Sequence, residues 1–361
     1  MTTAVDTLRR TAEPVPALRA ARGAVLKDVE QAVATLLEGE RARWKADAPQ
    51  ALPLIGGIAD LVAAGGKRLR PAFCVSGFLA AGGSAGEPGL VDLAAALEML
   101  HVFALIHDDV IDEADTRRGR PALHIAQARA HGAAGWRGDS ARFGESAAIL
   151  AGDLALTYAD QLLAGAAAPV REEWSRLCSE MIVGQFLDVS VAAEYNADPE
   201  VSRWVAVCKS GRYSIHRPLH IGALLAGRTD LEAGFEAYGR ALGEAFQLRD
   251  DLIDAFGDAE TAGKPTGLDF AQHKMTLLLA LAVQRDERVR ALVLPRSGGT
   301  DGADADELRA LLIDSGVRAE VEARVDHLVA EAIGALEHAP LDDAWRQELS
   351  AMAYEVAYRS R

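Results

Sequence analysis

The sequence predicts an all-α protein, folded as one large helical bundle. Alanine and leucine are abundant and aromatic residues make up only 6% of the chain, a composition that favours helices over strands. Of the 361 residues, 50% are hydrophobic, which is enough for a sizeable core. No linker rich in Pro, Gly and Ser divides the middle of the chain. We therefore expect a single domain over residues 21–361, preceded by a mobile leader over residues 1–20.

The expected helices follow from apolar residues spaced three or four apart. Residues 23–44 form one amphipathic pattern, and residues 90–112 form a longer one that predicts a continuous helix. Residues 130–145 are rich in glycine and are expected to form a long connection, followed by a helix over residues 147–163. The composition of residues 297–306 indicates flexibility, and further amphipathic helices are expected to complete the chain.

Charge and cysteine content limit the classes of partner and the compartment. The net charge of −15 argues against a nucleic-acid partner and against docking on an anionic membrane. The three cysteines, Cys74, Cys178 and Cys208, are far apart and lack metal-ligand spacing, so reduced thiols in a cytoplasmic protein are expected. No uninterrupted apolar run approaches 18 residues, and we therefore expect no transmembrane segment.

The first candidate site is an acidic cluster in the middle of the chain. Asp108 and Asp112 are four residues apart, which places both carboxylates on one face of a helix. Asp109 lies between them, and Arg117 and Arg118 follow, with a glycine directly behind. Stacked carboxylates repel, but Mg²⁺ binds one or two carboxylates and completes its coordination with water and phosphate oxygens. Guanidinium groups match phosphate oxygens, so the stretch suits a metal and a diphosphate.

A second acidic cluster repeats the same spacing more than a hundred residues downstream. Its members are Asp250, Asp251 and Asp254, and Gln247 falls on the same helical face. Two lysines follow in a region that contains glycine and proline: Lys264 and Lys274. Two such clusters, each with basic residues on its C-terminal side, predict two helices that face one another across a cavity, with metal and diphosphate between them.

These motifs resemble those of the trans-isoprenyl diphosphate synthases, the polyprenyl synthetase family. Both aspartate-rich signatures are present, and the segment GGKRLRP at residues 65–71 precedes the first. The resemblance extends from about Lys27 to the C-terminus and is greatest to geranylgeranyl diphosphate synthases. It implies a helical bundle of the isoprenoid synthase type around a deep central cavity, a homodimer, Mg²⁺ as cofactor, and isopentenyl diphosphate and an allylic diphosphate as substrates.

The resemblance also assigns roles to individual residues. The metal ligands are the six aspartates: Asp108, Asp109, Asp112, Asp250, Asp251 and Asp254. Isopentenyl diphosphate is held by a basic set: Lys67, Arg70, His101 and Arg118. The allylic diphosphate contacts a second set, in which a serine replaces the family's threonine: Arg117, Lys209, Ser210, Gln247, Lys264 and Lys274. Asp108, Asp112, Arg117, Lys209, Asp250 and Lys264 are the residues expected to drive ionisation. The glutamine of the 181–190 helix, Gln185, is a secondary candidate for the hydrocarbon pocket.

Product length is expected to depend on the residues four and five positions before the first aspartate. In the family these residues form the floor of the pocket, and two large aromatics give a short product. Here they are Phe103 and Ala104, one bulky and one small. This pair implies an intermediate product, with C20 first and C15 or C25 behind it.

Two other functions remain possible on the sequence alone. A class I terpene cyclase shares the ionisation chemistry but has no need of the basic set around Lys67 and Arg118. A non-catalytic subunit of a heteromeric synthase would be expected to carry degraded acidic motifs. Three remaining polar residues are expected to be structural: His107, and His216 and Arg217, which fit a helix kink with polar surface side chains before a proline.

Overall fold

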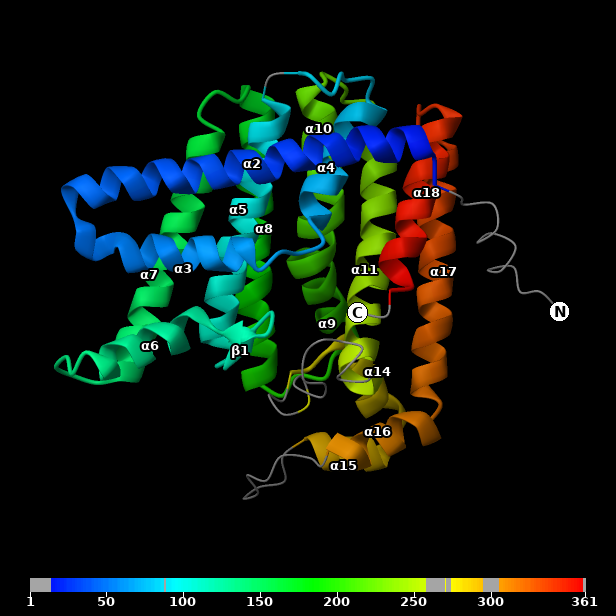
Figure 1. Ribbon diagram of the computed structural model, residues 1–361. Helices are drawn as coiled ribbons and strands as arrows, with labels where there is room; N and C mark the ends of the chain where they lie inside the picture. Colours follow the sequence, from blue (N-terminus) through cyan, green and yellow to red (C-terminus); the bar gives the residue numbers. More distant parts are fainter. Residues whose placement is uncertain (1–13, 88, 258–269, 271–273, 295–304, 360–361) are drawn as a thin grey trace. The chain divides into compact units, whose positions relative to one another are not determined.

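A computed structural model of the chain describes residues 14–87, 89–257, 270, 274–294 and 305–359 (Figure 1). The predicted all-α class is confirmed, because helices account for nearly all of the regular structure in these residues. Contacts group the chain into two compact units. Unit 1 comprises Met1–Ala20, Ser76–Gly83 and Pro169–Arg361, and unit 2 comprises Ala21–Val75 and Ser84–Ala168. Segments of the two units alternate along the chain, so the single-domain assignment stays a prediction.

Unit 2 is a helical layer built around one apolar helix, α5. Helices α6 and α7 pack on one another, α7 also packs on α5 and α3, and α2 and α3 run side by side (Figure 1). The elements in chain order are α2 (Pro16–Asp47), the 3₁₀ helix η1 (Pro49–Ala51), α3 (Leu52–Ala63), α4 (Leu69–Ala80), α5 (Leu90–Ile111), β1 (Thr116–Arg117), β2 (Arg120–Pro121), α6 (Leu123–Ala133) and α7 (Ser140–Leu162). The α4 helix is divided between the two units.

Helix α5 ends within one residue of the predicted helix 90–112. Its 22 residues are long and apolar enough to cross a membrane by length and composition, but 67% of the apolar window is buried inside the fold. Leu93, Leu97 and Leu100 are among its buried side chains. A helix that buries its apolar residues against neighbouring helices while carrying two aspartates at its end is typical of a protein core.

Unit 1 is organised around helix α11, which contacts η2, α10, α14, α17 and α18. Phe235, Tyr238 and Leu242 of α11 are fully buried, and the Tyr238 hydroxyl donates a hydrogen bond to the Leu349 carbonyl at 2.8 Å. The elements of this unit are α8 (Ala168–Ala193), α9 (Pro199–Val205), η2 (Ala206–His216), α10 (Arg217–Leu225), α11 (Glu232–Phe256), α14 (Leu277–Arg285), α15 (Glu287–Val293), α16 (Ala305–Asp314), α17 (Val317–Glu337) and α18 (Asp343–Ala357).

The segment η2 is a π-helix of 11 residues, a conformation that the sequence does not announce. At its end the Arg217 N–H bonds to the Arg212 carbonyl, five residues earlier, where an α-helix would use the residue four earlier. π-helical turns are rare in proteins overall, but those that occur are often found at functional sites. Two of the predicted site residues, Lys209 and Ser210, lie in this segment.

The boundary predicted for the N-terminal leader is too late. Helix α2 already begins at Pro16, because its first turn is tied to α18. The Val15 N–H donates to a Glu348 carboxylate oxygen at 2.7 Å, and Arg19 forms an ion pair with Glu355. Residues 1–13 lie outside the described part of the chain.

The glycine-rich connection over residues 130–145 is also shorter than expected. Helix α6 continues to Ala133 and α7 starts at Ser140, capped by Asp139, which accepts a bond from the Arg142 N–H at 2.7 Å. Gly144 lies inside α7. A Cβ at this position would come within 2.2 Å of the His124 carbonyl oxygen, so a side chain has no room there. Glycine in this stretch therefore reflects close helix packing as well as a turn.

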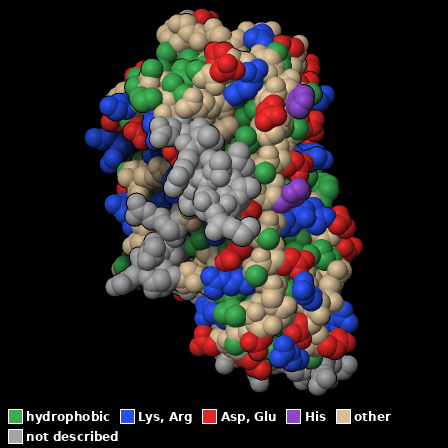
Figure 2. All heavy atoms as spheres, turned by 90° about the vertical axis from the view of Figure 1, so that its right-hand side faces the viewer, with side chains coloured by type: hydrophobic (Ala, Val, Ile, Leu, Met, Phe, Trp, Pro, Cys, Tyr) green, Lys and Arg blue, Asp and Glu red, His purple; other side chains and the backbone are tan. Residues whose placement is uncertain are grey.

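Acidic and basic side chains are intermingled on the face of the molecule that Figure 2 shows. Across the described residues of that face, the positive charges do not gather into an extended patch.

Candidate active site

The first aspartate motif lies at the C-terminal end of α5. Asp108 is in the last turn and Asp112 is the C-cap residue, whose N–H bonds to the Asp108 carbonyl at 2.8 Å. The last turn contains no basic residue. A helix C-terminus carries partial negative charge, so two carboxylates there are unfavourable without a cation. The local structure therefore creates a demand for positive charge at this point of unit 2.

The middle carboxylate of this motif has a partner within the chain. Asp109 is 2% exposed, and the Arg117 Nε donates to its Oδ1 at 2.7 Å. Burial raises the pKa of Asp109 above its usual range, while the Arg117 guanidinium acts in the opposite direction. Arg117 is presented by the β1–β2 hairpin, in which it pairs with Arg120. The two-residue turn between the strands has positive φ at both positions, 52° at Arg118 and 73° at Gly119, as a type I′ turn requires.

Basic side chains surround His101, which lies on α5 ahead of the first aspartate motif. Burial and the positive charges of Arg70, Arg118, Arg117 and Arg68, in that order, lower the pKa of His101 well below its ordinary value. Burial, Arg68, Arg117 and Arg70 also lower the pKa of Arg118, against Glu98. The structure thus brings together the predicted residues Arg70, His101, Arg117 and Arg118, which we call the cationic cluster. So many positive charges at one place suit a ligand of high negative charge.

The loop before α4 fits closely against this cluster. A Cβ on Gly66 would lie 2.8 Å from the Arg118 Nη2, and the Arg118 Nη1 donates to the Leu61 carbonyl at 3.1 Å. The predicted substrate residue Lys67 follows on the same loop and is exposed. Gly66 therefore leaves room for the Arg118 guanidinium, which fixes one side of the cationic cluster.

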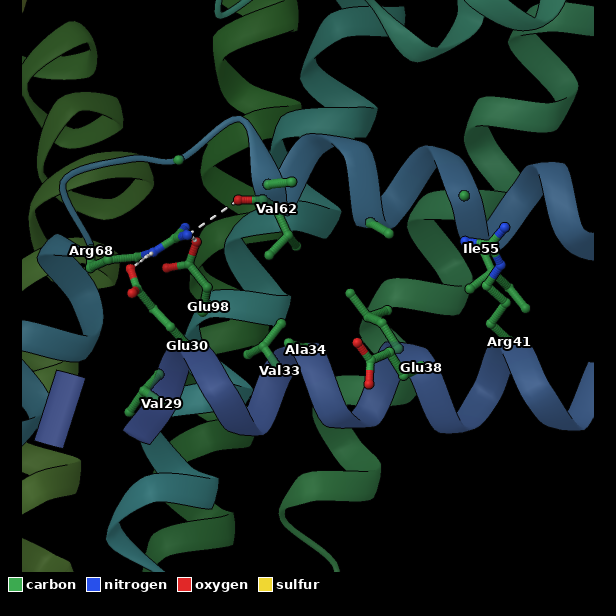
Figure 3. A pocket seen from close by; sticks show the side chains of 15 residues that line it. Val29, Glu30, Val33, Ala34, Glu38, Arg41, Ile55, Val62, Arg68 and Glu98 are labelled. Atoms are coloured by element: carbon green, nitrogen blue, oxygen red, sulfur yellow. Dashed lines mark hydrogen bonds and ion pairs between the residues drawn. The ribbon is translucent and has the colours of Figure 1, made fainter. Parts of the chain in front are cut away.

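Arg68 does not point freely into the site, because three groups hold its side chain. It forms ion pairs with the buried Glu98 and the exposed Glu30, and its Nη2 donates to the Val62 carbonyl at 3.2 Å (Figure 3). Its φ of 49° is in the left-handed region, which non-glycine residues rarely adopt. Arg68 is thus a clamp that fixes the loop carrying Lys67 and the start of α4, which carries Arg70.

A slot of about 520 Å³ lies between α2 and α3, with Arg68 and Glu98 at one end (Figure 3). Its walls are mainly apolar, from Val29, Val33 and Val62, whose positions Figure 3 labels. No residue of either aspartate motif lines this slot. The slot is therefore not the cavity that the motifs predict between them. That cavity stays a prediction.

The second aspartate motif lies at the C-terminal end of α11, which likewise has no basic residue in its last turn. Asp251 is 2% exposed and accepts a bond from the Gln247 Nε2 at 2.9 Å. The Gln247 Oε1 in turn accepts from the Ser210 hydroxyl at 2.6 Å. Asp254 is buried, while the side chain of Asp250 is 39% exposed and forms an ion pair with Arg359. Three predicted residues, Ser210, Gln247 and Asp251, thus form one hydrogen-bonded chain.

Lys209 is held beside this chain by a residue of α8. Its Nζ donates to the Asp188 Oδ2 at 2.7 Å, and both side chains are partly exposed. Gly184 permits the approach, since a Cβ there would lie 2.9 Å from the Lys209 backbone nitrogen. The secondary candidate Gln185 follows on α8, and both of its side-chain polar atoms are buried with no hydrogen-bond partner among the described residues.

Helix α8 also exposes an apolar stripe, which we call the α8 apolar face. Phe186 is 67% exposed, although large apolar side chains usually cover one another in a folded chain. The stripe consists of Ile182, Val183, Phe186 and Val189, spaced so that they share one side of the helix. A contiguous exposed apolar surface commonly marks a binding site.

The prediction that His216 and Arg217 are surface groups at a helix kink is wrong. His216 is 2% exposed, and Arg217 forms ion pairs with Glu173 and Glu180 of α8. The His220 Nδ1 lies 3.1 Å from the same Glu173 carboxylate. These contacts hold the pKa of Glu173 at about 2 despite its burial. The polar residues around Pro218 thus form a buried network that joins α8 to α10.

The two residues expected to set product length differ in burial. Phe103 is 8% exposed and its ring lies 4.6 Å from that of His107, while Ala104 is partly exposed. The His107 Nε2 lies 3.0 Å from the Ile149 carbonyl oxygen, and its ring fills the space above Gly152. His107 is therefore a structural residue, as predicted.

Two of the predicted lysines remain without a structural test. Lys264 lies outside the described residues. Lys274 is described and comes directly before the Met275–Thr276 cap of α14, where its carbonyl accepts a bond from the Thr276 N–H at 2.9 Å. Their roles toward the allylic diphosphate stay predictions.

Comparison with known proteins identifies the family. The family model described as "Polyprenyl synthetase" matches residues 54–312, well over half of the chain. The chain belongs to the polyprenyl synthetase family. This match includes both aspartate motifs and the cationic cluster, so the resemblance drawn from the motifs is confirmed.

Relatives of this polyprenyl synthetase include enzymes with short and long products. The chain is 34% identical over 247 residues to the short chain isoprenyl diphosphate synthase of Methanothermobacter thermautotrophicus, covering 66% of this chain and 70% of that protein. It is 31% identical over 306 residues to the octaprenyl diphosphate synthase of Escherichia coli, covering 83% and 88%. Both names denote prenyltransferases, and the chain is accordingly an isoprenyl diphosphate synthase.

A solved structure extends the likeness to almost the whole chain. The geranylgeranyl pyrophosphate synthase of Corynebacterium glutamicum, complexed with isoprenyl diphosphate and magnesium, superposes with a TM-score of 0.86 at 35% identity. The alignment covers 93% of this polyprenyl synthetase and 98% of that chain. The all-α fold of the family is therefore shared along nearly the full length.

The donor set of this polyprenyl synthetase fits a hard divalent cation that is completed by a substrate. Among the described residues, no three His, Cys, Asp or Glu side chains converge as a resident metal centre would need. Mg²⁺ does not need such a cage, because it retains water and binds through one or two carboxylates together with phosphate oxygens. Asp108 and Asp112 at one helix end, and Asp250 at another, supply carboxylates of this kind.

Sequence reasoning missed three residues that contact the site of this polyprenyl synthetase. Glu98 holds the Arg68 clamp, and its charge within the apolar face of α5 was a usable signal. Asp188 pairs with Lys209 and lies three residues after Gln185, a spacing that placed both on one face without naming the partner. Arg359 pairs with Asp250 from the far end of the chain, and no local pattern indicates it.

Proposed function

We propose that the protein condenses an allylic diphosphate with isopentenyl diphosphate to make a linear all-trans polyprenyl diphosphate. The observation that carries this proposal is the cationic cluster beside the first aspartate motif. A single ionised diphosphate would be served by the metal and a few cations. A cluster that includes Arg70, Arg118 and a neutral His101 provides for a second diphosphate, as chain elongation needs and cyclisation does not.

The residues of the chain divide between the two substrates. Arg117, Lys209 and Lys264 would bind the diphosphate of the allylic substrate and offset the charge that develops as it leaves. Mg²⁺, held by Asp108, Asp112 and Asp250, would neutralise that diphosphate further. Lys67, Arg70, His101 and Arg118 would orient isopentenyl diphosphate so that its double bond attacks the allylic carbocation. The released diphosphate would accept the proton that is lost in the last step. The proposal therefore assigns no side chain of the site as the base.

The remaining aspartates have a supporting role in this proposal. Asp109, Asp251 and Asp254 are buried, and two of them are already bonded to Arg117 and Gln247. They would keep their helices' exposed carboxylates oriented and add negative charge near the metal ions. Gln247, Ser210 and Lys274 would complete the contacts with the allylic diphosphate.

The hydrocarbon part of the substrate needs an apolar wall that also excludes water, since water would quench a carbocation. The α8 apolar face supports this requirement, because it offers exposed apolar side chains on the helix that carries Gln185. The product would be geranylgeranyl diphosphate, C20, in first place, with C15 and C25 as the nearest alternatives. Phe103 and Ala104, one bulky and one small, support an intermediate length, while the named relatives range from short chain to octaprenyl synthases.

The test is a product assay. Purified protein is incubated with Mg²⁺, labelled isopentenyl diphosphate and, in turn, dimethylallyl, geranyl or farnesyl diphosphate, and the dephosphorylated products are separated by chromatography. We expect a linear C20 alcohol that disappears with chelator or with Asp108→Ala, and persists in Asp92→Asn, an exposed aspartate in the first turn of the same helix. A cyclic hydrocarbon would instead indicate a terpene cyclase, and no incorporation from any primer would indicate a non-catalytic subunit.

We further propose a homodimer located in the cytoplasm. Ile149 and Leu150 of α7 are 41% and 59% exposed, which gives that helix apolar surface suited to a second copy. The three cysteines form no disulfide, in keeping with a reducing compartment. Sedimentation of wild type and of Leu150→Asp would test the dimer, with monomer expected for the variant and unchanged sedimentation contradicting this interface.

A further inference from the structure

The last three described residues, Ala357, Tyr358 and Arg359, each contact another part of unit 1. The Ala357 carbonyl accepts a bond from the Arg249 Nε at 2.7 Å, and the Tyr358 hydroxyl donates to the Asp326 Oδ1 at 2.6 Å. Arg359 then forms an ion pair with Asp250, the first carboxylate of the second aspartate motif. This run, which we call the C-terminal latch, ends on a residue that the proposed function uses for metal.

The guanidinium of Arg359 is held in place from two sides. Its central carbon lies 3.9 Å from the centroid of the Phe246 ring, a cation–π distance, and its side chain is only 12% exposed. Phe246 precedes Asp250 by four residues, so ring and carboxylate lie on one face of α11. The ring thus supports the guanidinium against the carboxylate, and the contact is built rather than incidental.

The electrostatics of the motif explain what this cation does. Asp250 and Asp254 are four residues apart at a helix C-terminus, where negative charges repel one another and the helix dipole. A positive charge on Asp250 relieves that repulsion. A divalent cation on Asp250 Oδ1 relieves it more strongly, and it would compete there with the Arg359 guanidinium, which contacts the same oxygen.

We propose that Arg359 is a built-in counter-ion of the second aspartate motif, which holds Asp250 while metal is absent and is displaced when metal binds. Metal binding would then release the C-terminal latch, so that the order of the last residues reports the occupancy of the motif. By thermodynamic reciprocity, metal bound at Asp250 weakens the Arg359–Asp250 contact by the same factor by which that contact weakens metal binding. This inference rests on the proposed role of Asp250 as a metal ligand.

The first experiment measures metal binding directly. Mn²⁺ in place of Mg²⁺ is titrated into the full chain and followed by electron paramagnetic resonance, with no substrate and no turnover. We expect Arg359→Gln to bind Mn²⁺ about two- to fivefold more tightly than wild type, the range set by a half-exposed ion pair. Arg359→Lys retains the charge but loses the planar contact with Phe246, and should lie between the two.

Tyr358→Phe is the matched control. It removes the neighbouring bond of the latch, to Asp326 on α17, without touching Asp250. If the gain in Arg359→Gln reflected only a loosened chain end, Tyr358→Phe would show the same gain. Unchanged Mn²⁺ affinity in Tyr358→Phe together with tighter binding in Arg359→Gln supports direct competition at Asp250.

Hydrogen exchange provides a second readout. The Tyr358 N–H bonds to the Tyr354 carbonyl at 3.0 Å in the latched state. We expect Mn²⁺ to accelerate exchange of this amide in wild type, and we expect Arg359→Gln to exchange quickly with or without metal. Slower exchange on metal addition would overturn the proposal, because the latch would then be tightened by the ion.

Asp250→Asn separates the two ways of failing. If Asp250→Asn weakens Mn²⁺ binding while Arg359→Gln matches wild type, Asp250 is a metal ligand and the latch is wrong. If Asp250→Asn leaves Mn²⁺ binding unchanged, the proposed metal site itself fails, and the inference falls with it.

Discussion

The two aspartate motifs have the same spacing along the chain but meet different partners in the structure. In the first, the buried Asp109 is bonded to a cation, Arg117, from a hairpin a few residues later. In the second, the buried Asp251 is bonded to a neutral amide, Gln247, from the same helix. The exposed member of the second motif, Asp250, meets its cation from the end of the chain. Equal spacing thus fixes which helical face the carboxylates share but not how each is compensated.

The two motifs differ in where the cations beside them come from in the chain. Around the first motif the cations come from nearby loops and surround His101, so they form a lasting part of unit 2. Around the second motif, among the described residues, Asp251 accepts a hydrogen bond from Gln247, and Asp250 forms an ion pair with Arg359 near the C-terminus. Under the proposed function, the first region would hold a diphosphate, and the second would exchange the Arg359 guanidinium for a metal ion.

The largest expected effect tests whether both motifs serve the same chemistry. Asp108→Asn and Asp250→Asn should each lower kcat/KM by at least about 100-fold, because each removes a charge that holds the metal against the developing negative charge. Steady-state assays with farnesyl diphosphate check this, with Asp92→Asn as the exposed control on α5. Retained activity in Asp250→Asn alone would break the comparison, since the second motif would then hold no essential metal.

The Arg68 clamp provides the next effect and concerns stability. Glu98 and Glu30 both pair with Arg68, but their side chains are 5% and 57% exposed. Breaking a buried pair is expected to cost about 3 kcal/mol, and an exposed one under about 1 kcal/mol. Urea unfolding of Glu98→Gln and Glu30→Gln should separate the two accordingly. Equal losses of stability in the two variants would show that burial of Glu98 does not strengthen its ion pair with Arg68.

A smaller effect distinguishes the two buried aspartates. Asp109→Asn deprives Arg117 of its counter-ion and should lower kcat/KM about tenfold or more. Asp251→Asn keeps an oxygen that accepts the Gln247 bond, so its loss should stay within about threefold. The same steady-state assay measures both. A loss in Asp251→Asn as large as in Asp250→Asn would mean that Asp251 binds metal itself, and the contrast between the motifs would narrow.

The smallest effect is a pH dependence of stability in unit 1. His216 is buried, neither ring nitrogen has a hydrogen-bond partner among the described residues, and burial, Arg217 and His220 lower its pKa to about 3. The unfolded chain binds a proton on this residue near pH 6.5 and the folded chain does not, so stability falls as the pH drops below about 6.5. The contribution is at most about 1.4 kcal/mol per pH unit.

Urea unfolding at several pH values from about 6.5 to about 5 measures that slope. His216→Asn should flatten it by close to one proton, whereas His327→Asn, an exposed residue of α17, should leave it unchanged. An identical slope in His216→Asn would mean that His216 accepts a proton in the folded chain, and the buried network around Arg217 would have to compensate for it.

The sequence predicts best what is local. The helix that carries the first motif was expected at 90–112 and lies at Leu90–Ile111, because apolar periodicity and the spacing of Asp108 and Asp112 depend only on neighbouring residues. The family motif names Arg70, His101 and Arg118 as one basic set, and the structure places Arg117 beside them as well. Their roles toward a substrate stay predictions.

The rest depends on contacts between distant segments. Arg217 and His216 are polar neighbours of a proline, and nothing in that stretch reveals that Glu173 and Glu180 of α8 lie beside them. The pairing of Arg359 with Asp250 requires the tertiary path of the C-terminus. The early start of α2 follows from its ties to α18, which no property of the first twenty residues encodes.

The contacts at the two ends of the π-helix η2 depend on the number of residues between them. Lys209 lies near its start and reaches Asp188, and Arg217 follows its end and reaches Glu173. Removing a single residue between them would shift one end by one helical position, a rotation of about 100° relative to the other. One of the two contacts would then be lost, whichever residue was removed. A single-residue deletion within Ala206–His216 is therefore expected to cost at least one of the two contacts.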